Sequence, residues 1–250
     1  MCGRFGIPGD YVEMANNFDI SPGIERDTVW ETLIPRYNVA PTDQVPAIFE
    51  KDGHRYLELM RWGLIPFHAE QMRGRAVLDR NEKTINTPIN ARAETVESRG
   101  SFKSSFQKRR CLIPAGGFYE WKKNGRKRSP YWLHLEDQSW MAFAGLYNWW
   151  KTPLGKWMSS CTIITTVANG FMEPIHERMP VILTEGTYDL WLDPENRDLS
   201  ELKEVLVPFS SAKMRGHRIA SLVNKVQNDG PGLIEPSPSM ISDQEPRLFT

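Results

Sequence analysis

The sequence contains little cysteine, and its three cysteines lie far apart. Three thiols without a Cys-x-x-Cys spacing exclude a disulfide framework and a zinc finger, and they suit a reducing compartment. Neither sign of charge is in excess, because 31 lysines and arginines balance 31 aspartates and glutamates. This balance argues against a broadly basic nucleic-acid binder, although a local basic groove remains compatible with it.

Long apolar runs are also lacking. No segment approaches the length of a membrane-spanning helix, and the N-terminus has no charged-then-apolar signal pattern. We therefore expect a soluble cytosolic protein.

Motifs of several enzyme classes are missing as well. There is no Gly-x-Ser-x-Gly motif and no phosphate-binding glycine loop. Four of the histidines show no metal-ligand spacing: His54, His68, His134 and His217. No metal and no organic cofactor is predicted.

Strand signals dominate the rest of the chain. The patterns predict strands on both sides of turns at residues 51–53 and at Asn124-Gly125, and two further strands over residues 140–150 and 158–167. Helices are expected at residues 10–18, at 199–206, and in a segment capped by Thr184. Regular alternation of strands and helices is absent, so the sequence predicts an α+β fold.

Cys2, in the opening sequence MCGRF, could act as a nucleophile. Removal of Met1 would give Cys2 a free α-amine with a pKa of about 7.7–8.0, partly unprotonated at neutral pH. Such an amine and its neighbouring thiol can take up an aldehyde, first as a Schiff base and then as a five-membered ring. The alternative is that Cys2 is merely one of the small residues that commonly follow an initiator methionine.

Asn90 and Arg92 lie in the segment NARAE, between turn residues. An amide beside a guanidinium can orient an oxygen-rich ligand, and the forked Arg92 suits a phosphate. The alternative is a surface ion pair between Arg92 and Glu94, which the segment alone favours.

Glu120 follows a pair of glycines in CLIPAGGFYEW. Strand alternation places Phe118 and Glu120 on one face, opposite Tyr119 and Trp121. A carboxylate among aromatic rings has its charged form disfavoured, which suits general acid–base chemistry. The alternative, pairing with Lys122 or Lys123, is equally compatible with the segment.

His176 lies between Pro174 and Pro180, in a segment predicted to be a rigid loop. Histidine is the natural proton shuttle near pH 7. A single histidine is more often structural, and the segment by itself favours that interpretation.

Seven segments occur together in an order that resembles the SRAP family, the SOS response-associated peptidases or abasic-site processing proteins. They are MCGRF at the start, RYNVAPT at 36–42, RWGLIP at 61–66, NARAET at 90–95, RRCLIPAGGFYEW at 109–121, TIITTVAN at 162–169 and HERMPVIL at 176–183. The resemblance implies one α+β domain over residues 2–236, in which a bifurcated, mostly antiparallel sheet forms a pseudo-barrel with peripheral helices. Residues 237–250 would be a flexible tail, and the Pro-, Gly- and Ser-rich composition itself predicts an extended or disordered chain over residues 228–250.

The resemblance also implies an activity. Such proteins shield abasic sites in single-stranded DNA by covalent attachment, through a Schiff base and then a thiazolidine at Cys2 after removal of Met1. Asn90 would position the sugar and the amine, Glu120 would aid ring opening and proton transfer, and His176 would handle protons at the sugar. Autocatalytic release of Met1 and a β-lyase activity through the Schiff base are implied as well.

Contacts with DNA follow from the same resemblance. The residues expected to hold the DNA backbone or the lesion are Arg4, Asn38, Arg92, Thr165 and Arg178, with Pro41 and Trp62 as walls. Some relatives have paired tryptophans after the Trp-Gly-x-x-Pro motif, whereas this chain has Phe67 and His68 there. The segment that follows Phe67, residues 68–88, is long. Phe67 can still stack on a base.

The expected partner is single-stranded DNA with abasic sites, bound by a monomer in the bacterial cytosol or nucleoid. The sequence QEPRLF at 244–249 loosely resembles peptides that bind the sliding clamp, although a disordered end explains it more simply.

Two other functions remain open at this point. One is a cysteine peptidase acting on other proteins with Cys2 and His176, and the other is a non-catalytic binder of single-stranded DNA, which would not need Cys2.

Overall fold

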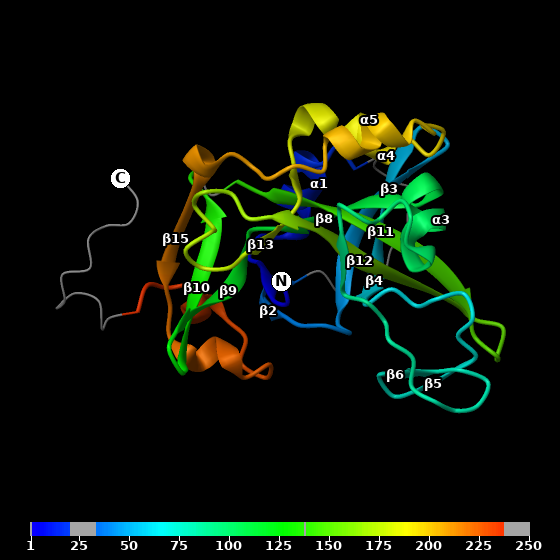
Figure 1. Cartoon of the computed structure of the whole chain (residues 1–250), viewed down its shortest axis with the longest axis horizontal. Coiled ribbons are helices and arrows are strands. Elements are labelled where there is room, and N and C mark those ends of the chain that lie inside the picture. The colour runs from blue at the N-terminus through cyan, green and yellow to red at the C-terminus, as the bar shows by residue number, and fades with distance from the viewer. Residues whose placement is uncertain (1, 21–33, 138, 238–250) are drawn as a thin grey trace.

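Five strands of the protein close on themselves to form a small barrel (Figure 1). The computed structural model describes residues 2–20, 34–137 and 139–237. The barrel strands are β3 (Gln44–Lys51), β4 (His54–Trp62), β8 (Arg110–Ala115), β11 (Met141–Lys151) and β12 (Trp157–Val167). Neighbours pair in the order β12-β4-β3-β8-β11, and β11 pairs again with β12, which closes the ring. The β4–β12 pair is parallel and the other pairs in the ring are antiparallel.

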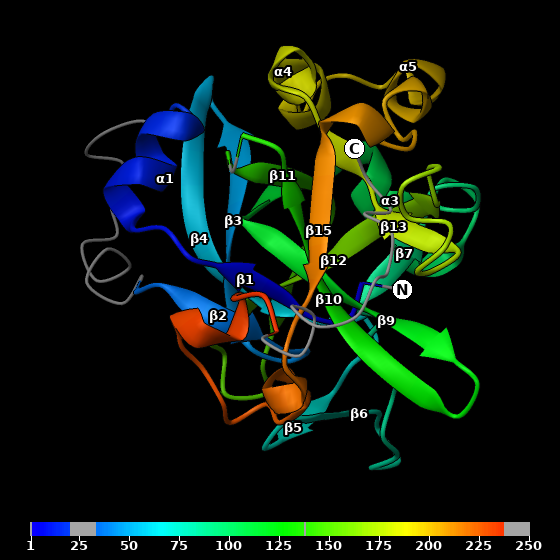
Figure 2. The same ribbon diagram turned by 90° about the vertical axis from the view of Figure 1, so that its left-hand side faces the viewer.

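A second sheet lies against the barrel and faces the viewer in Figure 2. Its strands, in spatial order, are β15 (Met214–Arg218), β10 (Lys127–Leu135), β9 (Gly117–Asn124), β1 (Phe5–Ile7) and β2 (Arg36–Val39). All of its pairs are antiparallel. The N-terminal strand β1 is therefore an inner strand with β9 on one side and β2 on the other.

Aromatic side chains join the two sheets. The ring of Phe5 on β1 packs edge-on against Trp62 of β4 and Phe143 of β11, with centroid distances of 5.1 and 5.9 Å. All three side chains are fully buried. Burial of each ring is worth about 1.5–3 kcal/mol, and edge-to-face contacts add to it. The α+β fold with mostly antiparallel sheets is thus confirmed, and its core fixes the N-terminal strand against the barrel.

Both predicted hairpins are present, one of them with a shifted turn. The β3–β4 hairpin turns at Asp52 and Gly53, whose φ angles are 52° and 74°. In the β9–β10 hairpin, Asn124 pairs with Lys127, so the two loop residues are Gly125 and Arg126. The expected turn at Asn124-Gly125 was one residue too early, because Gly125, with φ of 58°, takes the first position of the loop.

The helices are short and lie around the barrel: α1 (Tyr11–Asn17), α3 (Gly100–Lys108), α4 (Tyr188–Leu192) and α5 (Leu199–Glu204). The helix expected at residues 10–18 is α1, and Asp10 caps it by accepting a hydrogen bond from the backbone N–H of Glu13. Helix α3 was not predicted, because its glycine and three serines are weak helix formers.

The predicted cap at Thr184 is only partly confirmed, because Thr184 takes the N-cap position without a side-chain bond. Residues Glu185–Thr187 form a 3-10 turn before α4, and the Thr184 side chain makes no capping bond there. Instead, the hydroxyl of Thr187 donates to the carbonyl of Thr184 at 2.7 Å. The tighter turn brings this hydroxyl back onto the preceding carbonyl.

The long segment at 68–88 contains a small hairpin of β5 (Gln71–Arg73) and β6 (Ala76–Leu78). Val77 of β6 packs with Ile65, Ala69 and Trp150 in a separate apolar cluster.

The described residues form three further strands, β7 (Asn90–Arg92), β13 (Arg178–Pro180) and β14 (Ile182–Leu183). Among the described residues, no helix reaches the length and hydrophobicity that crossing a bilayer requires.

The expectation of an extended or disordered chain from residue 228 was wrong for its first ten residues. Leu233 is buried, Pro236 forms a β-bridge with Ile219, and the N–H of Ser237 donates to the carbonyl of Arg218. Apolar contacts and backbone pairing hold this proline-rich stretch in place. Residues 238–250, including the predicted clamp-binding peptide, lie outside the described residues.

Candidate functional site

Cys2 lies just before β1, and the N-terminus emerges between the second sheet and the barrel (Figure 1). Its side chain is fully buried, with Sγ 4.0 Å from the carbonyl oxygen of Arg4. The amide of Asn90 donates from Nδ2 to the carbonyl oxygen of Cys2 at 2.9 Å. Asn90 begins β7, which pairs in parallel with the end of β12. The structure thus brings together two of the predicted site residues, from opposite sides of the gap between the sheets.

Glu120 is the third residue of this group. It lies on β9 two residues after Phe118, which pairs with Phe5 of β1. The carboxylate side chain is buried, and so are the neighbouring side chains of both faces, Phe118 and Tyr119, so the strand alternation alone did not decide its burial. Burial raises the pKa of the Cys2 thiol, and the negative charge of Glu120 raises it further. The thiol of Cys2 is therefore held in its neutral form near pH 7.

His176 precedes β13, the strand that pairs with the end of β12. Its ring is half-buried, and the backbone N–H of Arg178 donates to its Nδ1 at 3.0 Å. Nδ1 also lies 3.2 Å from the carbonyl oxygen of Arg178, so the backbone of Arg178 holds the imidazole in either neutral tautomer.

Arg178 forms a forked ion pair with Glu94. The distances from its two terminal nitrogens to the carboxylate oxygens are 2.5 and 3.0 Å, and Nη2 also donates to the carbonyl of Thr165 at 2.6 Å. The hydrogen bond with Arg178 lowers the pKa of Glu94. The expected pairing of Glu94 with Arg92 was wrong, because Arg178 reaches Glu94 from across β12. Arg92 is exposed instead.

A groove of about 500 Å³ opens beside Asn90. It is lined in part by Arg92 and by Arg99, the residue at the start of α3. Pro66 and His68 form another wall, and Phe67 between them is 86% exposed. Cations beside an exposed aromatic ring are typical of grooves that bind single-stranded nucleic acid. Sequence analysis missed Arg99, whose position became meaningful only once α3 was known.

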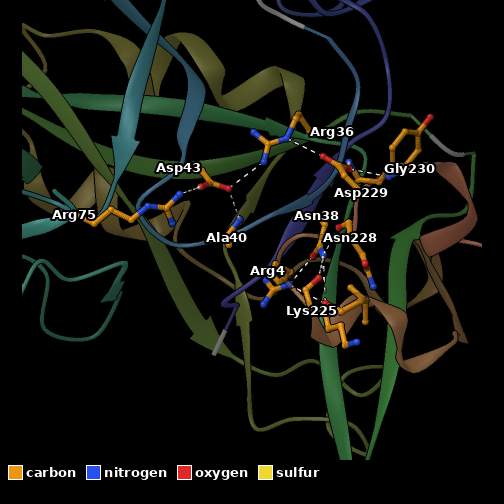
Figure 3. Close-up of polar contacts among 12 residues, drawn as sticks. Arg4, Arg36, Asn38, Ala40, Asp43, Arg75, Lys225, Asn228, Asp229 and Gly230 are labelled. Carbon is orange, nitrogen blue, oxygen red and sulfur yellow. Dashed lines mark hydrogen bonds and ion pairs between the residues drawn. The ribbon is translucent and has the colours of Figure 1, made fainter.

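Arg4 and Asn38 are joined to each other and to the C-terminal part of the domain (Figure 3). Nη1 of Arg4 donates to Oδ1 of Asn38 at 2.6 Å and to the carbonyl of Val223 at 2.9 Å. Nδ2 of Asn38 donates to the carbonyls of Lys225 and Asn228 at 3.0 and 2.8 Å. Asn38 is buried, so it fixes the chain around Arg4 rather than facing the groove.

Two other predicted contact residues also lie in the interior. Trp62 donates from Nε1 to the carbonyl of Ile89 at 2.9 Å and is fully buried. Thr165 is fully buried, and its hydroxyl lies 3.3 Å from the carbonyl of Ala91. Pro41 is half-buried, in the turn after β2. These positions shape the backbone beside the groove, and Pro41 is the one of the three with exposed surface.

Asp43 is the centre of a second network, which sequence analysis missed (Figure 3). Its carboxylate lies 3.1 Å from Nη2 of Arg36 and 3.4 Å from Nη2 of Arg75, and it accepts from the backbone of Ala40. Arg36 also pairs with Asp229 at 3.0 Å. The network connects β2, the β5–β6 hairpin and the C-terminal segment. Arg36 lies in the segment RYNVAPT, but only the fold shows its partners.

Comparisons with known proteins found related sequences and a similar fold. The family model described as "SOS response associated peptidase (SRAP)" matches residues 1–226. The abasic site processing protein YoqW of Bacillus subtilis is 39% identical over 94% of this chain and 99% of its own length. The abasic site processing protein HMCES of Rattus norvegicus is 27% identical over 99% of this chain and 79% of its own. A crystal structure of a protein from Bacteroides thetaiotaomicron superposes with a TM-score of 0.81 at 25% identity, over 94% of this chain and 100% of that one.

The Arg178–Glu94 pair predicts a loss of stability on substitution. Glu94→Gln leaves the buried guanidinium of Arg178 without its charge partner. We expect the free energy of unfolding, measured in urea, to fall by about 1–3 kcal/mol. This loss is smaller than that for breaking a fully buried ion pair, because the Glu94 side chain is half-exposed and partly solvated.

Glu97→Gln is the matched control. Glu97 pairs with Lys203 at 2.9 Å, and both side chains are more than one-third exposed. Its loss should stay below about 1 kcal/mol. Equal, small losses for the two variants would contradict a structural role for the Arg178–Glu94 pair.

Proposed function

The chain belongs to the SOS response associated peptidase (SRAP) family, and from that premise we propose that it processes abasic sites in single-stranded DNA by bonding to them through Cys2. The observation that supports this proposal most directly is the chemical environment of Cys2. A buried thiol, a hydrogen bond from the side-chain amide of Asn90 to the Cys2 carbonyl and the charge of Glu120 meet beside a cationic groove.

The proposed reaction starts with hydrolysis of the Met1–Cys2 peptide bond, which frees the α-amine of Cys2. The amine adds to the aldehyde carbon of the ring-opened abasic sugar, and loss of water gives a Schiff base. The thiol then adds to the same carbon, and its proton is transferred to the nitrogen. The product is a thiazolidine, in which carbon–nitrogen and carbon–sulfur bonds join protein and sugar.

The raised pKa of the Cys2 thiol fits this order of steps. A neutral thiol is a poor nucleophile, so the first attack falls to the amine, whose pKa is much closer to 7. Closure of the ring then needs a base to take the thiol proton. Glu120 is the proposed base, because its carboxylate is near enough to act on the thiol electrostatically.

The other site residues have proposed roles around this centre. Asn90 orients Cys2 through its carbonyl, and His176, held by the backbone of Arg178, exchanges protons with the sugar oxygen. Arg92 and Arg4 bind phosphates, and Phe67 stacks on a base next to the lesion.

The buried residues act indirectly in this proposal. Asn38 holds Arg4, and Arg178 with Thr165 fixes the end of β12. Pro41 and Trp62 shape the wall of the groove.

A lyase reaction is a second outcome of the same Schiff base, which permits β-elimination of the 3′ phosphate. Closure of the thiazolidine removes the C=N bond and therefore ends the lyase reaction.

Cys2→Ser tests the covalent step. The heat-stable adduct with an abasic oligonucleotide should fall by about a hundredfold or more, because the hydroxyl is a much weaker nucleophile toward the Schiff base. Trapping of the Schiff base with borohydride should persist, since the amine remains. Gel analysis after heating in detergent measures both products.

Cys161→Ser is the matched control, since Cys161 is another fully buried thiol. It should form the adduct normally. A heat-stable adduct at the wild-type rate in Cys2→Ser would refute the proposal. Equal non-covalent binding of intact and abasic DNA, without any adduct in the wild type, would favour a simple binder.

Glu120→Gln tests the base. We expect ring closure to slow by about 10²–10⁴-fold near neutral pH, with a larger borohydride-trapped fraction because the Schiff base accumulates. Raising the pH should restore part of the rate, since hydroxide then removes a proton from a thiol whose pKa is raised. Rapid-quench kinetics measure the two adducts, and a wild-type closing rate would contradict the role of Glu120.

A further inference from the structure

The end of the barrel opposite to Cys2 opens into an aromatic groove of about 920 Å³, here called the aromatic mouth. Its aromatic lining consists of Phe49, Tyr56, Tyr147, Trp149 and Trp157. These residues lie at the end of β3, the start of β4, the end of β11 and the start of β12. Because β3 and β11 run opposite to β4 and β12, the ends of the first two strands and the starts of the other two meet at one end of the barrel. Mouths of β-barrels are common ligand sites.

The aromatic mouth is well separated from the N-terminal site. Tyr56 lies six residues before Trp62 on β4, and Trp149 lies six residues after Phe143 on β11. At a rise of about 3.3 Å per residue, each separation is about 20 Å. Trp62 and Phe143 are the residues that contact Phe5 beside Cys2. A ligand at the mouth would therefore leave the proposed DNA groove free.

The rings of the mouth form a connected cluster with an exposed side. Phe49 stacks on Tyr56 with centroids 5.6 Å apart and an interplanar angle of 14°. Trp149 packs edge-on against Phe49 and Tyr147, at 5.9 and 5.0 Å. Trp149 is 39% exposed and Trp157 is 67% exposed. Large aromatic side chains gathered at the surface of a groove are typical of binding sites.

The charges around the mouth favour a cation. Its lining contains five carboxylates against three cations, a net charge of −2: Glu50, Asp52, Glu58, Asp193 and Glu195 against Lys51, Lys108 and Arg109. Two of the carboxylates already have cationic partners, since Asp52 lies 3.9 Å from Lys51 and Glu195 lies 3.5 Å from Arg197, so Glu50, Glu58 and Asp193 are the ones left to attract a further cation. Burial raises the pKa of Glu50, and the charges of Asp193 and Asp189 raise it further, as expected in a negative potential. Phosphate groups would be repelled here.

We propose that the aromatic mouth binds an arginine-containing peptide segment of a partner protein, with a guanidinium against the rings of Trp149 and Trp157 and within reach of Glu50 and Glu58. The Trp157 ring already contacts one cation, Nζ of Lys151 at 5.8 Å from its centroid, which the guanidinium would displace. A guanidinium is planar, stacks on aromatic faces and forms forked hydrogen bonds with carboxylates. The lining offers both kinds of contact, and charge complementarity selects a basic peptide over DNA. The partner would be held at one end of the barrel while the other end acts on its substrate.

Fluorescence anisotropy with a labelled nonapeptide of alternating arginine and proline tests this inference. Saturable binding is expected, and a peptide with neutral citrulline in place of arginine should bind about tenfold more weakly or worse. Trp149→Ala and the double variant Glu50→Gln/Glu58→Gln should each weaken binding by a similar factor. The matched control is Leu154→Ala, an 89% exposed residue outside the mouth, which should leave the affinity unchanged.

Other outcomes would overturn the proposal. They are the absence of saturable binding, equal affinity for the citrulline peptide, or full affinity in both mouth variants. Tighter binding of a labelled nine-nucleotide oligo-dT that is lost in Trp149→Ala would assign the mouth to nucleic acid instead. If circular dichroism shows Trp149→Ala to be unfolded, Trp157→Ala replaces it, since that side chain is mostly exposed.

Discussion

The position of the N-terminal strand is the constraint on which the rest of this structure depends. Strand β1 is held between β9 and β2, and Phe5 is packed against Trp62 and Phe143 of the barrel. A chain terminus is usually the least ordered part of a domain, but here it is built into the core. Cys2 can therefore be placed within hydrogen-bond reach of Asn90 and beside the charge of Glu120, as an internal residue would be.

The same burial determines the chemistry that the site can perform. A thiol removed from water and placed near a carboxylate stays protonated, so Cys2 does not resemble the activated thiolate of a cysteine peptidase. In the proposed reaction the amine attacks first and the thiol closes the ring afterwards, an order that makes use of this neutral state. The ion pair of Arg178 with Glu94 and the bonds from Asn38 to the C-terminal segment hold the walls around that centre.

Sequence reasoning succeeded where the signal is local and failed where it depends on distant partners. Turn residues predicted the β3–β4 and β9–β10 hairpins, and the pattern of residues 10–18 predicted α1, because these signals lie within a few residues. The pairing of Glu94 with Arg178 joins residues 84 positions apart, and neighbouring Arg92 seemed the better partner from the sequence. Trp62 could stack on a ligand in principle, but the fold turns it into the core. Helix α3 is held by Phe102 and Phe106 in spite of weak propensity, so only tertiary packing decides it.

The two ends of the barrel differ in charge and chemistry, with arginines beside Asn90 at one end and carboxylates among aromatic rings at the other. The central claim concerns the first end, and it is the proposal that Cys2 captures an abasic sugar covalently. Intact mass spectrometry of the protein after incubation with a single-stranded abasic oligonucleotide, with and without borohydride, tests it most directly. The account predicts one adduct with the mass of the protein without Met1 plus the oligonucleotide less one water, unchanged by borohydride because a thiazolidine has no C=N bond. An adduct that retains Met1, a mass increase of two hydrogens after borohydride, or no adduct with a free Cys2 amine would contradict it.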